Sequence, residues 1–377
     1  MSNTPPKSTA EVRRLNRNRV YRYLYSATNA ITKQDLAYEL SMSMPTLTQN
    51  LNDLLAQGLI DYSGTADSTC GRRPRIISVV PGARYAIGVE LTSGHIRIVA
   101  INLLVHELAA QTVTKAFDPS EEYAIELQNL IERFIMENGI DPARLLGVGI
   151  TVPGIVDNKQ EIISNAPTLH IKHLSTKLLT DHIRYPVNLT NDATAGGFAE
   201  WWNRTDIGDM AYLSVGRGVG GAILIAGVPY LGHFSRSGEF GHMCIHPKGL
   251  KCNCGRLGCL EAYCSTSKIS DDLGITLEQF FQSLEAGNQE YSQLWDSYLD
   301  DLVIGIRNIN STLDCGIVLG GKLSQFLAGH LTAIDQRLRE TDPNYREVPY
   351  FSICRYHTQA SGIGAALYFV DQFICQI

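Results

Sequence analysis

The sequence lacks long hydrophobic runs: none of its 377 residues belongs to a stretch approaching the ~18 uninterrupted apolar residues that a membrane span needs. A secretory signal is also lacking, because Met1–Pro6 is polar and no apolar segment follows it. We therefore expect a cytoplasmic protein with no membrane partner. A chain of this length exceeds one ordinary compact core, so two or three domains are expected.

The sequence also lacks the cysteine pairs of a disulfide framework. Its nine cysteines are an odd number, and most of them lie in one cluster instead of spreading as pairs through a small chain. This distribution is typical of a reducing compartment and of metal binding. No tandem sequence repeat is identifiable, although the two halves of the body can still repeat in structure.

Charge is distributed unevenly along the chain. The net charge is −6, yet residues 1–80 contain ten Lys and Arg against six Asp and Glu, which leaves +4 there and −10 on the remainder. A basic N-terminal part on an acidic body predicts that only the N-terminal part meets a polyanion.

The basic part has the pattern of a winged helix-turn-helix. Apolar residues at helical spacing predict helices within 17–27, 32–43 and 43–58. Thr32 and Ser43 are good N-caps, and Gly58 suits a C-terminal stop. The short turn around 41–43 between the second and third helices is typical of a helix-turn-helix.

The third helix and the segment after it carry the predicted DNA contacts. Hydroxyl and amide groups on the exposed face of this helix bond base edges or phosphates, and the candidates are Thr46, Thr48, Gln49 and Asn50. Strands predicted at 59–65 and 75–80 enclose a wing with Arg72 and Arg73, which suit phosphate or the minor groove. Residues 1–80 are therefore predicted to read double-stranded operator DNA. A three-helix module that meets protein is the alternative.

Residues 81–377 have the strand and helix patterns of an α/β domain. The predicted strands of the first half are 85–92, 95–103, 106–114 and 145–157, with a helix at 123–139 before the last. This order begins a ribonuclease-H-like or actin-like lobe. A second half follows, with two strands in 209–230, a helical stretch at 276–312, a strand at 316–321 and a closing helix at 361–374. We expect two lobes, approximately 81–190 plus the C-terminal helix, and 191–360.

One short segment concentrates metal-binding side chains. Its histidine precedes the first of three closely spaced cysteines by ten residues, and the set is His242, Cys252, Cys254 and Cys259. One imidazole and three thiolates suit a closed, tetrahedral Zn²⁺ site. Cys244 and His246 are alternative ligands. Four protein ligands leave no open coordination position, so the zinc is predicted to be structural.

The chain resembles the ROK family (repressors, open reading frames and sugar kinases) over essentially its whole length. The resemblance rests on the stretches "VPGIVD", "NDATAGGFAE", "VGRGVGGAI", "GEFGH", "CNCGRLGCLEAY" and "IVLGG". It implies an ATPase-type ROK domain and the same four zinc ligands. It also implies a sugar pocket made by Gly154, Asn191, Asp192, Glu239, His242 and Glu261, with His242 using the ring nitrogen that zinc does not.

The phosphate-binding turns depart from the kinases of this family. The residue matching Asp192 is the general base in those kinases. Where they carry Asp-x-Gly-Gly-Thr, this sequence reads Glu90–Gly94 as "ELTSG", and its side chains prevent the backbone from closing on a polyphosphate. Arg217 stands where the kinases usually carry Thr, which leaves a sugar phosphate open as a ligand.

These features together predict a regulator and not an enzyme. We expect a sugar-responsive DNA-binding transcriptional regulator, a repressor released by a monosaccharide or a sugar phosphate. Family members work as dimers or higher oligomers, so a homodimer or a dimer of dimers on a pseudo-palindromic site is expected. The alternative is an ATP-dependent sugar kinase, of the glucokinase or N-acetylhexosamine kinase type, with a fused regulatory domain.

Overall fold

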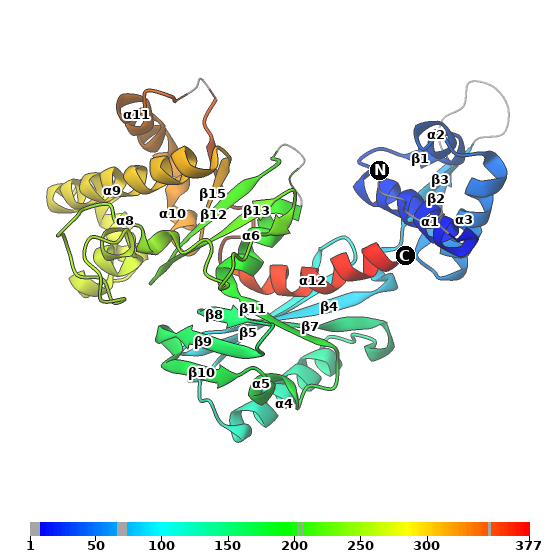
Figure 1. Ribbon diagram of the computed structural model, residues 1–377, viewed down its shortest axis with the longest axis horizontal. Helices are drawn as coiled ribbons and strands as arrows, with labels where there is room; N and C mark the ends of the chain where they lie inside the picture. The colour runs from blue at the N-terminus through cyan, green and yellow to red at the C-terminus, as the bar shows by residue number, and fades with distance from the viewer. Residues whose placement is uncertain (1–7, 66–73, 203, 205–206, 346–347) are drawn as a thin grey trace.

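A helical head and two sheet-based lobes follow one another along the chain in the computed structural model (Figure 1), which describes residues 8–65, 74–202, 204, 207–345 and 348–377. The mixed α/β composition and the two lobes agree with the predicted class. Among the described residues, no helix combines the length and the apolar character needed to cross a membrane.

The head contains three helices and a small antiparallel sheet of order β1-β3-β2. Its elements are α1 (Thr9–Ser26), β1 (Ile31–Thr32), α2 (Lys33–Glu39), α3 (Met44–Ala56), β2 (Ile60–Thr65) and β3 (Arg75–Val79). Both predicted N-caps are confirmed: the Thr32 hydroxyl accepts a hydrogen bond from the Asp35 amide, and the Ser43 hydroxyl accepts one from Thr46. Gly58, with a φ of +66°, follows the end of α3 as predicted.

The first lobe is built on a five-stranded sheet of order β11-β7-β4-β5-β6. Three strands form an antiparallel meander, β4 (Tyr85–Leu91), β5 (His95–Asn102) and β6 (Glu107–Thr114). Two further strands run parallel to β4 in the order β7 (Leu145–Val152) and β11 (Val187–Asn191). α4 (Glu121–Glu137) packs on one face of the sheet through a shared apolar cluster. A smaller sheet extends the lobe with β8 (Ile155–Asp157), β9 (Ile162–Ala166) and β10 (Ile171–Ser175), followed by the short helix α5 (Lys177–Thr180).

The second lobe repeats this topology. Its sheet has the order β14-β13-β12-β15-β16, again an antiparallel meander extended by two parallel strands. The strands are β12 (Met210–Val215), β13 (Val219–Ile225), β14 (Val228–Pro229), β15 (Gly316–Gly320) and β16 (Phe351–Ile353). The predicted helical stretch at 276–312 divides into α8 (Leu277–Glu285) and α9 (Gln289–Leu313), because Asn288 caps a new helix there. The remaining helices are α6 (Asp192–Trp202), α7 (Glu261–Cys264), α10 (Ser324–Leu327) and α11 (Leu331–Thr341).

The closing helix, α12 (Ala360–Gln376), lies between the two lobes (Figure 1). It covers the face of the first sheet opposite α4 and packs against α6 of the second lobe. Glycine makes the approach to α6 very close, because a Cβ added at Gly364 would lie 1.8 Å from the Ala195 carbonyl oxygen. The lobes therefore meet across two helices in direct backbone contact.

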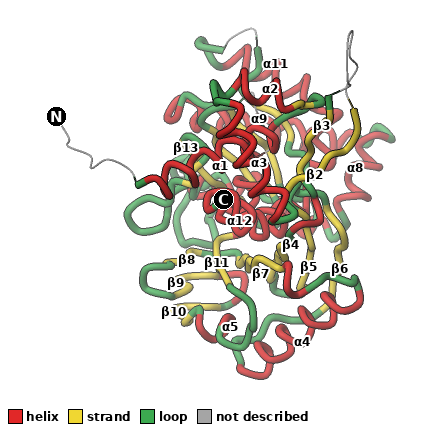
Figure 2. The backbone as a smooth tube through the Cα atoms, turned by 90° about the vertical axis from the view of Figure 1, so that its right-hand side faces the viewer, coloured by secondary structure: helices red, strands yellow, loops and turns green. Residues whose placement is uncertain are grey.

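The head packs on the end of α12 (Figure 1), and the view from the head's side agrees (Figure 2). The Arg17 guanidinium donates a hydrogen bond of 2.8 Å to the Ile377 carbonyl oxygen. One apolar cluster joins buried residues of the head, the first sheet and α12, among them Tyr21, Ile101 and Val370. Movement of α12 relative to the first lobe would therefore disturb contacts of the head.

Candidate functional site

A small, partly open cavity of about 40 Å³ lies between loops of both lobes. Its polar lining comes from Asn191, Thr194, Ser235, Ser237 and Glu239. A larger, open hollow of about 310 Å³ on the first lobe, lined by residues such as Asn158 and Tyr185, contains none of the predicted site residues.

Asn191 and Asp192 lie where β11 ends and α6 begins. The Asn191 side-chain amide donates to the Gly154 carbonyl oxygen at 3.0 Å and to Asp192 Oδ1 at 3.1 Å. Asn191 Oδ1 in turn accepts a hydrogen bond of 2.8 Å from the Thr194 amide, which caps the helix. Asn191 therefore fixes the Gly154 loop, the Asp192 carboxyl group and the start of α6 in one arrangement.

Gly154 is required by close backbone packing. A Cβ at this position would lie 2.6 Å from the Asn165 carbonyl oxygen and 2.5 Å from the Ala166 Cβ. No residue with a Cβ fits here without moving β9, so packing alone requires the glycine, and its role in a sugar pocket stays a prediction.

Three carboxyl groups influence one another's pKa, and one of them, Glu239, lines the cavity. Burial first, and then the charges of Glu90 and Glu239, together raise the pKa of Asp192 to about 7. Burial also raises the pKa of Glu239, which the neighbouring His242 opposes. Glu90 lies on β4 and forms an ion pair of 3.0 Å with Arg97, and burial raises its pKa against the effect of Arg97. Carboxyl groups with pKa values above their ordinary range are typical of functional sites.

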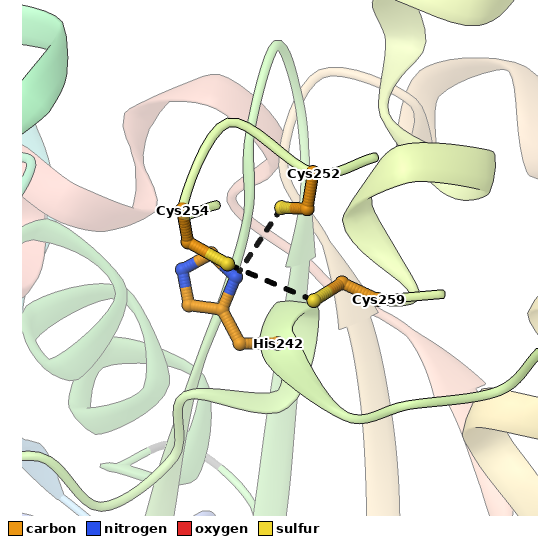
Figure 3. Close-up of side chains that lie close together, drawn as sticks. All are labelled: His242, Cys252, Cys254 and Cys259. Atoms are coloured by element: carbon orange, nitrogen blue, oxygen red, sulfur yellow. Dashed lines mark hydrogen bonds between the residues drawn. The ribbon is translucent and has the colours of Figure 1, made fainter. Parts of the chain in front are cut away.

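The four predicted metal ligands lie together (Figure 3), with ligand atoms within 4.8 Å of one another. Cys252 Sγ lies 3.7 Å from His242 Nδ1, and Cys254 Sγ lies 3.7 Å from Cys259 Sγ. A tetrahedral Zn²⁺ with sulfur at ~2.3 Å has ligand–ligand edges of about 3.8 Å, so the four side chains fit this ion. Burial raises the pKa of the Cys252 thiol to about 12, and zinc would instead require its thiolate.

The two alternative ligands have other contacts. His246 Nε2 lies 2.5 Å from Asp301 Oδ1, so its ring is held by a carboxylate of α9. The exposed Cys244 thiol lies 3.8 Å from the Leu257 carbonyl oxygen. Neither belongs to the group of four, which favours His242 and the three closely spaced cysteines.

The segment that carries the four ligands, residues 242–259 (the metal loop), also contacts residues around the cavity. Glu261 accepts a hydrogen bond of 2.9 Å from the Val219 amide with one oxygen, and its other oxygen lies 3.6 Å from Cys252 Sγ. The Nε2 atom of His242 lies 3.8 Å from the Oε2 atom of Glu239. A Cβ added at Gly241 would lie 1.9 Å from the Val219 carbonyl oxygen, so the loop packs directly on the glycine turn between β12 and β13.

The six predicted sugar-binding residues occupy different layers around the cavity. Gly154, Asn191 and Glu239 line it, and Asp192 lies directly beside Asn191. His242 and Glu261 lie behind this lining, where they contact Glu239, Val219 and the metal loop. Sequence reasoning missed Thr194, Ser235 and Ser237. The last two precede Glu239 in "SRSGE", and their hydroxyl-rich spacing was the available signal.

The predicted DNA-contacting residues on α3 differ in exposure. Gln49 is exposed, and Thr46 and Thr48 are half-buried. The prediction that Asn50 lies on the exposed face is wrong, because this residue is only 2% exposed and donates to the Thr46 carbonyl oxygen at 2.8 Å. Position 50 falls on the same helix face as the buried Leu47 and Leu54. Arg72 and Arg73 lie outside the described residues.

Comparisons with known proteins show which family and which proteins the chain is similar to. The model of the ROK family matches residues 86–372. The xylose repressor of Caldicellulosiruptor bescii is 28% identical over 239 residues, 62% of this chain and 60% of that protein. The DNA-binding transcriptional dual regulator NagC of Escherichia coli is 26% identical over 345 residues, 87% of this chain and 83% of that protein.

Solved structures with the same fold include both regulators and kinases. A ROK family transcriptional regulator, described as a homologue of the Escherichia coli MLC protein, has a TM-score of 0.77 at 22% identity and covers 96% of each chain. The ROK hexokinase of Thermus thermophilus has a TM-score of 0.64 at 25% identity. The hexokinase comparison covers 77% of this chain and 99% of that enzyme.

Proposed function

The chain belongs to the ROK family, and from this premise we propose that it is a sugar-responsive transcriptional repressor. Its head is a winged helix-turn-helix that binds operator DNA, and a monosaccharide or sugar phosphate in the cleft releases it. The observation that carries the proposal is the extent of similarity: a regulator named as DNA-binding aligns over 87% of this chain, beyond the ROK body alone.

The head supports DNA binding through the exposed side of α3. Gln49 is free to meet a base edge, while Thr46 and Thr48 are partly accessible for phosphate or base contacts. Asn50 is left out of this set because it is buried. Two heads of a homodimer would read the two halves of a pseudo-palindromic operator, and a dimer of dimers would engage two such sites.

The position of the cavity supports a conformational response to sugar. Its lining comes from loops of both lobes, so a sugar bound there would contact both lobes at once. Such a ligand shifts the arrangement of the lobes by the difference between its affinities for the two states. This difference in affinity is the free energy with which sugar binding can weaken DNA binding by the head, typically ~1–3 kcal/mol.

Two hydrogen bonds connect the head to the ends of helices that lie between the lobes, so we expect movement of the lobes to displace the head. α6 starts at Asp192 beside the cavity and ends at Trp202, whose indole N–H donates a hydrogen bond of 3.1 Å to the Tyr25 hydroxyl in α1. The rings of Trp202 and Tyr25 also meet edge to face at 6.0 Å. α12 supplies the second contact, from Ile377 to Arg17. These two helices pack against each other at the boundary between the lobes, and each ends at the head.

Zinc, held by His242 and the three cysteines, would supply a fixed fold for the loop that carries Glu239 and Glu261. The chain's own residues do the recognition. Asn191 and Glu239 present amide and carboxyl groups to the cavity, and each group left unpaired by a wrong ligand costs binding free energy.

The test is a titration of the full-length protein with duplex DNA from its own upstream region, followed by fluorescence anisotropy. We expect salt-dependent binding that is reversed by a sugar. Absence of duplex binding at low salt would refute the repressor, and binding that no sugar or sugar phosphate changes would refute the sensor.

A sugar kinase is the second candidate, because Asp192 has a pKa of about 7, near neutrality, as a general base requires. Sugar-dependent release of ADP that disappears in Asp192→Asn would establish it. The turn after β4 favours the repressor. The Thr92 amide donates a hydrogen bond of 3.0 Å to the His95 carbonyl oxygen, and the Thr92 hydroxyl accepts one of 2.9 Å from the His95 amide. The turn therefore carries side chains where a phosphate would need bare backbone.

A further inference from the structure

Two of the arginines on α1 are engaged inside the head. The Arg13 guanidinium donates to the two carboxylate oxygens of Asp53 at 2.8 Å and 2.7 Å, and Arg17 lies 4.0 Å from the same carboxylate. Asp53 belongs to α3, so these arginines hold α1 against α3 and their charge is offset there. The positive charge that the head offers to a polyanion has to come from other residues.

Lys33, at the start of α2, keeps its charge beside the exposed side of α3. Its ammonium group donates a hydrogen bond of 2.5 Å to the Thr48 hydroxyl, and Lys33 forms no ion pair with any residue that the structure describes. Gln49, the residue after Thr48, is exposed. An unpaired positive charge therefore lies on the flank of the helix that the proposed function brings to DNA.

The hydroxyl of Thr48 has no hydrogen left for a base. It donates to the Met44 carbonyl oxygen at 2.6 Å, one turn earlier in α3. A hydroxyl group has one hydrogen and two acceptor lone pairs, so the Thr48 oxygen accepts from Lys33. Of the three ammonium hydrogens of Lys33, one points to Thr48, and none of the described residues accepts the other two. Thr48 thereby fixes the direction in which the ammonium group points.

A charge on the flank of a helix meets the DNA backbone when the helix enters the major groove. The groove is about 12 Å wide, and a helix with its side chains is about 10–12 Å across, so the flank of an inserted helix lies against the phosphates along the groove wall. An ammonium group donates to a phosphate oxygen whatever the base sequence is.

We propose that Lys33 binds a phosphate group of the operator beside the groove that α3 enters, and that Thr48 orients Lys33 and reads no base. This inference rests on the proposed function and adds to it a phosphate contact from α2. It also narrows the role of Thr48, whose partly accessible hydroxyl acts on DNA through Lys33.

The experiment measures duplex binding of the full-length protein by fluorescence anisotropy at several salt concentrations. Two duplexes are compared: one from the protein's own upstream region, and one with the same length and composition in shuffled order. For Lys33→Met we expect the affinity for both duplexes to fall by the same factor, roughly 10-fold at low salt. The slope of log affinity against log salt concentration should become shallower by about 0.9, which corresponds to the loss of one phosphate contact.

Three further variants serve as controls. Lys33→Arg keeps the charge and should keep the wild-type slope. Lys172→Met is the matched control, because it removes the same charge at an exposed position on β10 in the first lobe, and it should leave both affinities unchanged. The melting temperature shows whether each variant is folded, and Lys33→Gln takes the place of Lys33→Met if the latter is unfolded.

A double-mutant cycle tests the role of Thr48. Thr48→Val removes the hydroxyl group and keeps the shape of the side chain. It should weaken binding to both duplexes by the same factor, so the ratio of the two affinities stays constant. In the Lys33→Met background it should have no further effect, because Thr48 acts through Lys33.

Several results would overturn the inference alone. An unchanged slope in folded Lys33→Met, or a loss of affinity confined to the upstream duplex, would refute the phosphate contact. A lower affinity ratio in Thr48→Val, or an equal loss in both backgrounds, would show that Thr48 meets DNA itself. If the wild type binds neither duplex at low salt, the proposed function fails as well.

Discussion

Asp192 places a carboxyl group where its charge is disfavoured. Burial, and then the charges of Glu90 and Glu239, raise its pKa from an ordinary 3.8 to about 7. The folded protein thus holds a proton that the unfolded chain releases between these two values. The resulting stability is present in full below the unfolded pKa and is lost as the pH rises through about 7.

We predict that Asp192→Asn removes this pH dependence. Between about pH 5 and about pH 8, the wild type should lose roughly 2–3 kcal/mol of stability relative to the variant. Thermal melting of both proteins across this range is the measurement. A constant difference between the two melting temperatures would show that Asp192 titrates normally.

Exposure separates two neighbouring residues of α3. Gln49 is exposed and Asn50 is buried, although the sequence offers both as polar groups on one helix. A substitution at Gln49 should act on DNA binding, and one at Asn50 should act on folding.

We predict that Gln49→Ala weakens duplex binding by about 1–3 kcal/mol, if the side chain meets a base edge, without lowering the melting temperature. Gln57→Ala is the matched control, because Gln57 is also exposed but caps the C-terminal end of α3, where its amide bonds the Asp53 carbonyl oxygen. Anisotropy with a fixed duplex measures both. Equal affinities for the two variants would contradict the docking of α3 into a groove.

At the scale of elements, the metal loop and the turn between β12 and β13 behave as one unit. Glu261 bonds the Val219 amide, and Gly241 packs on the Val219 carbonyl oxygen. The loop has little apolar core of its own, since its small cluster contains Cys252, Cys259 and Ala262. Four metal bonds would therefore supply most of its rigidity.

We predict that Cys254→Ser loses zinc and sugar binding together, while Cys244→Ser retains both. The pair is matched, because both thiols are exposed and lie in the same loop, but only Cys254 belongs to the group of four. Metal analysis should find about one zinc per chain in the wild type and in Cys244→Ser. Zinc retained in full by Cys254→Ser would refute the ligand set.

At the scale of the whole molecule, the head is tied to both lobes. α12 ends beside α1, and Trp202 at the end of α6 reaches Tyr25, 177 residues earlier in the chain. The cavity lies at the opposite end of α6. A rigid helix between two sites transmits a displacement only if both sites bias it, and the prediction below tests that condition at the Trp202 contact.

We predict that Trp202→Phe weakens the sugar-induced loss of DNA affinity by about 0.5–2 kcal/mol while sugar binding itself is retained. Trp201→Phe is the control, because Trp201 also loses an N–H, but its partner is the Gly208 carbonyl oxygen within the second lobe. The measurement is DNA affinity with and without saturating sugar. An unchanged response in Trp202→Phe would exclude this contact from the coupling.

Much of the architecture was predictable from local patterns. Thr32, Ser43 and Gly58 marked the helix ends, and β-rich runs marked the central strands of both sheets, whereas the edge strands β11 and β16 were not predicted. The metal ligands were equally predictable, since three cysteines within eight residues need only a tight turn to converge. In each case the signal and its effect lie within a few residues of one another.

What the sequence by itself determined is therefore the metal group and those helices and strands that have a strong local pattern, and α6 is not among them. Only the tertiary structure decided that Asn50 is buried, that Glu90 acts on Asp192 and that Trp202 meets Tyr25. The physical reason is that burial and charge coupling depend on which surfaces pack together. That packing joins strands and helices far apart in the chain, where no short pattern records it.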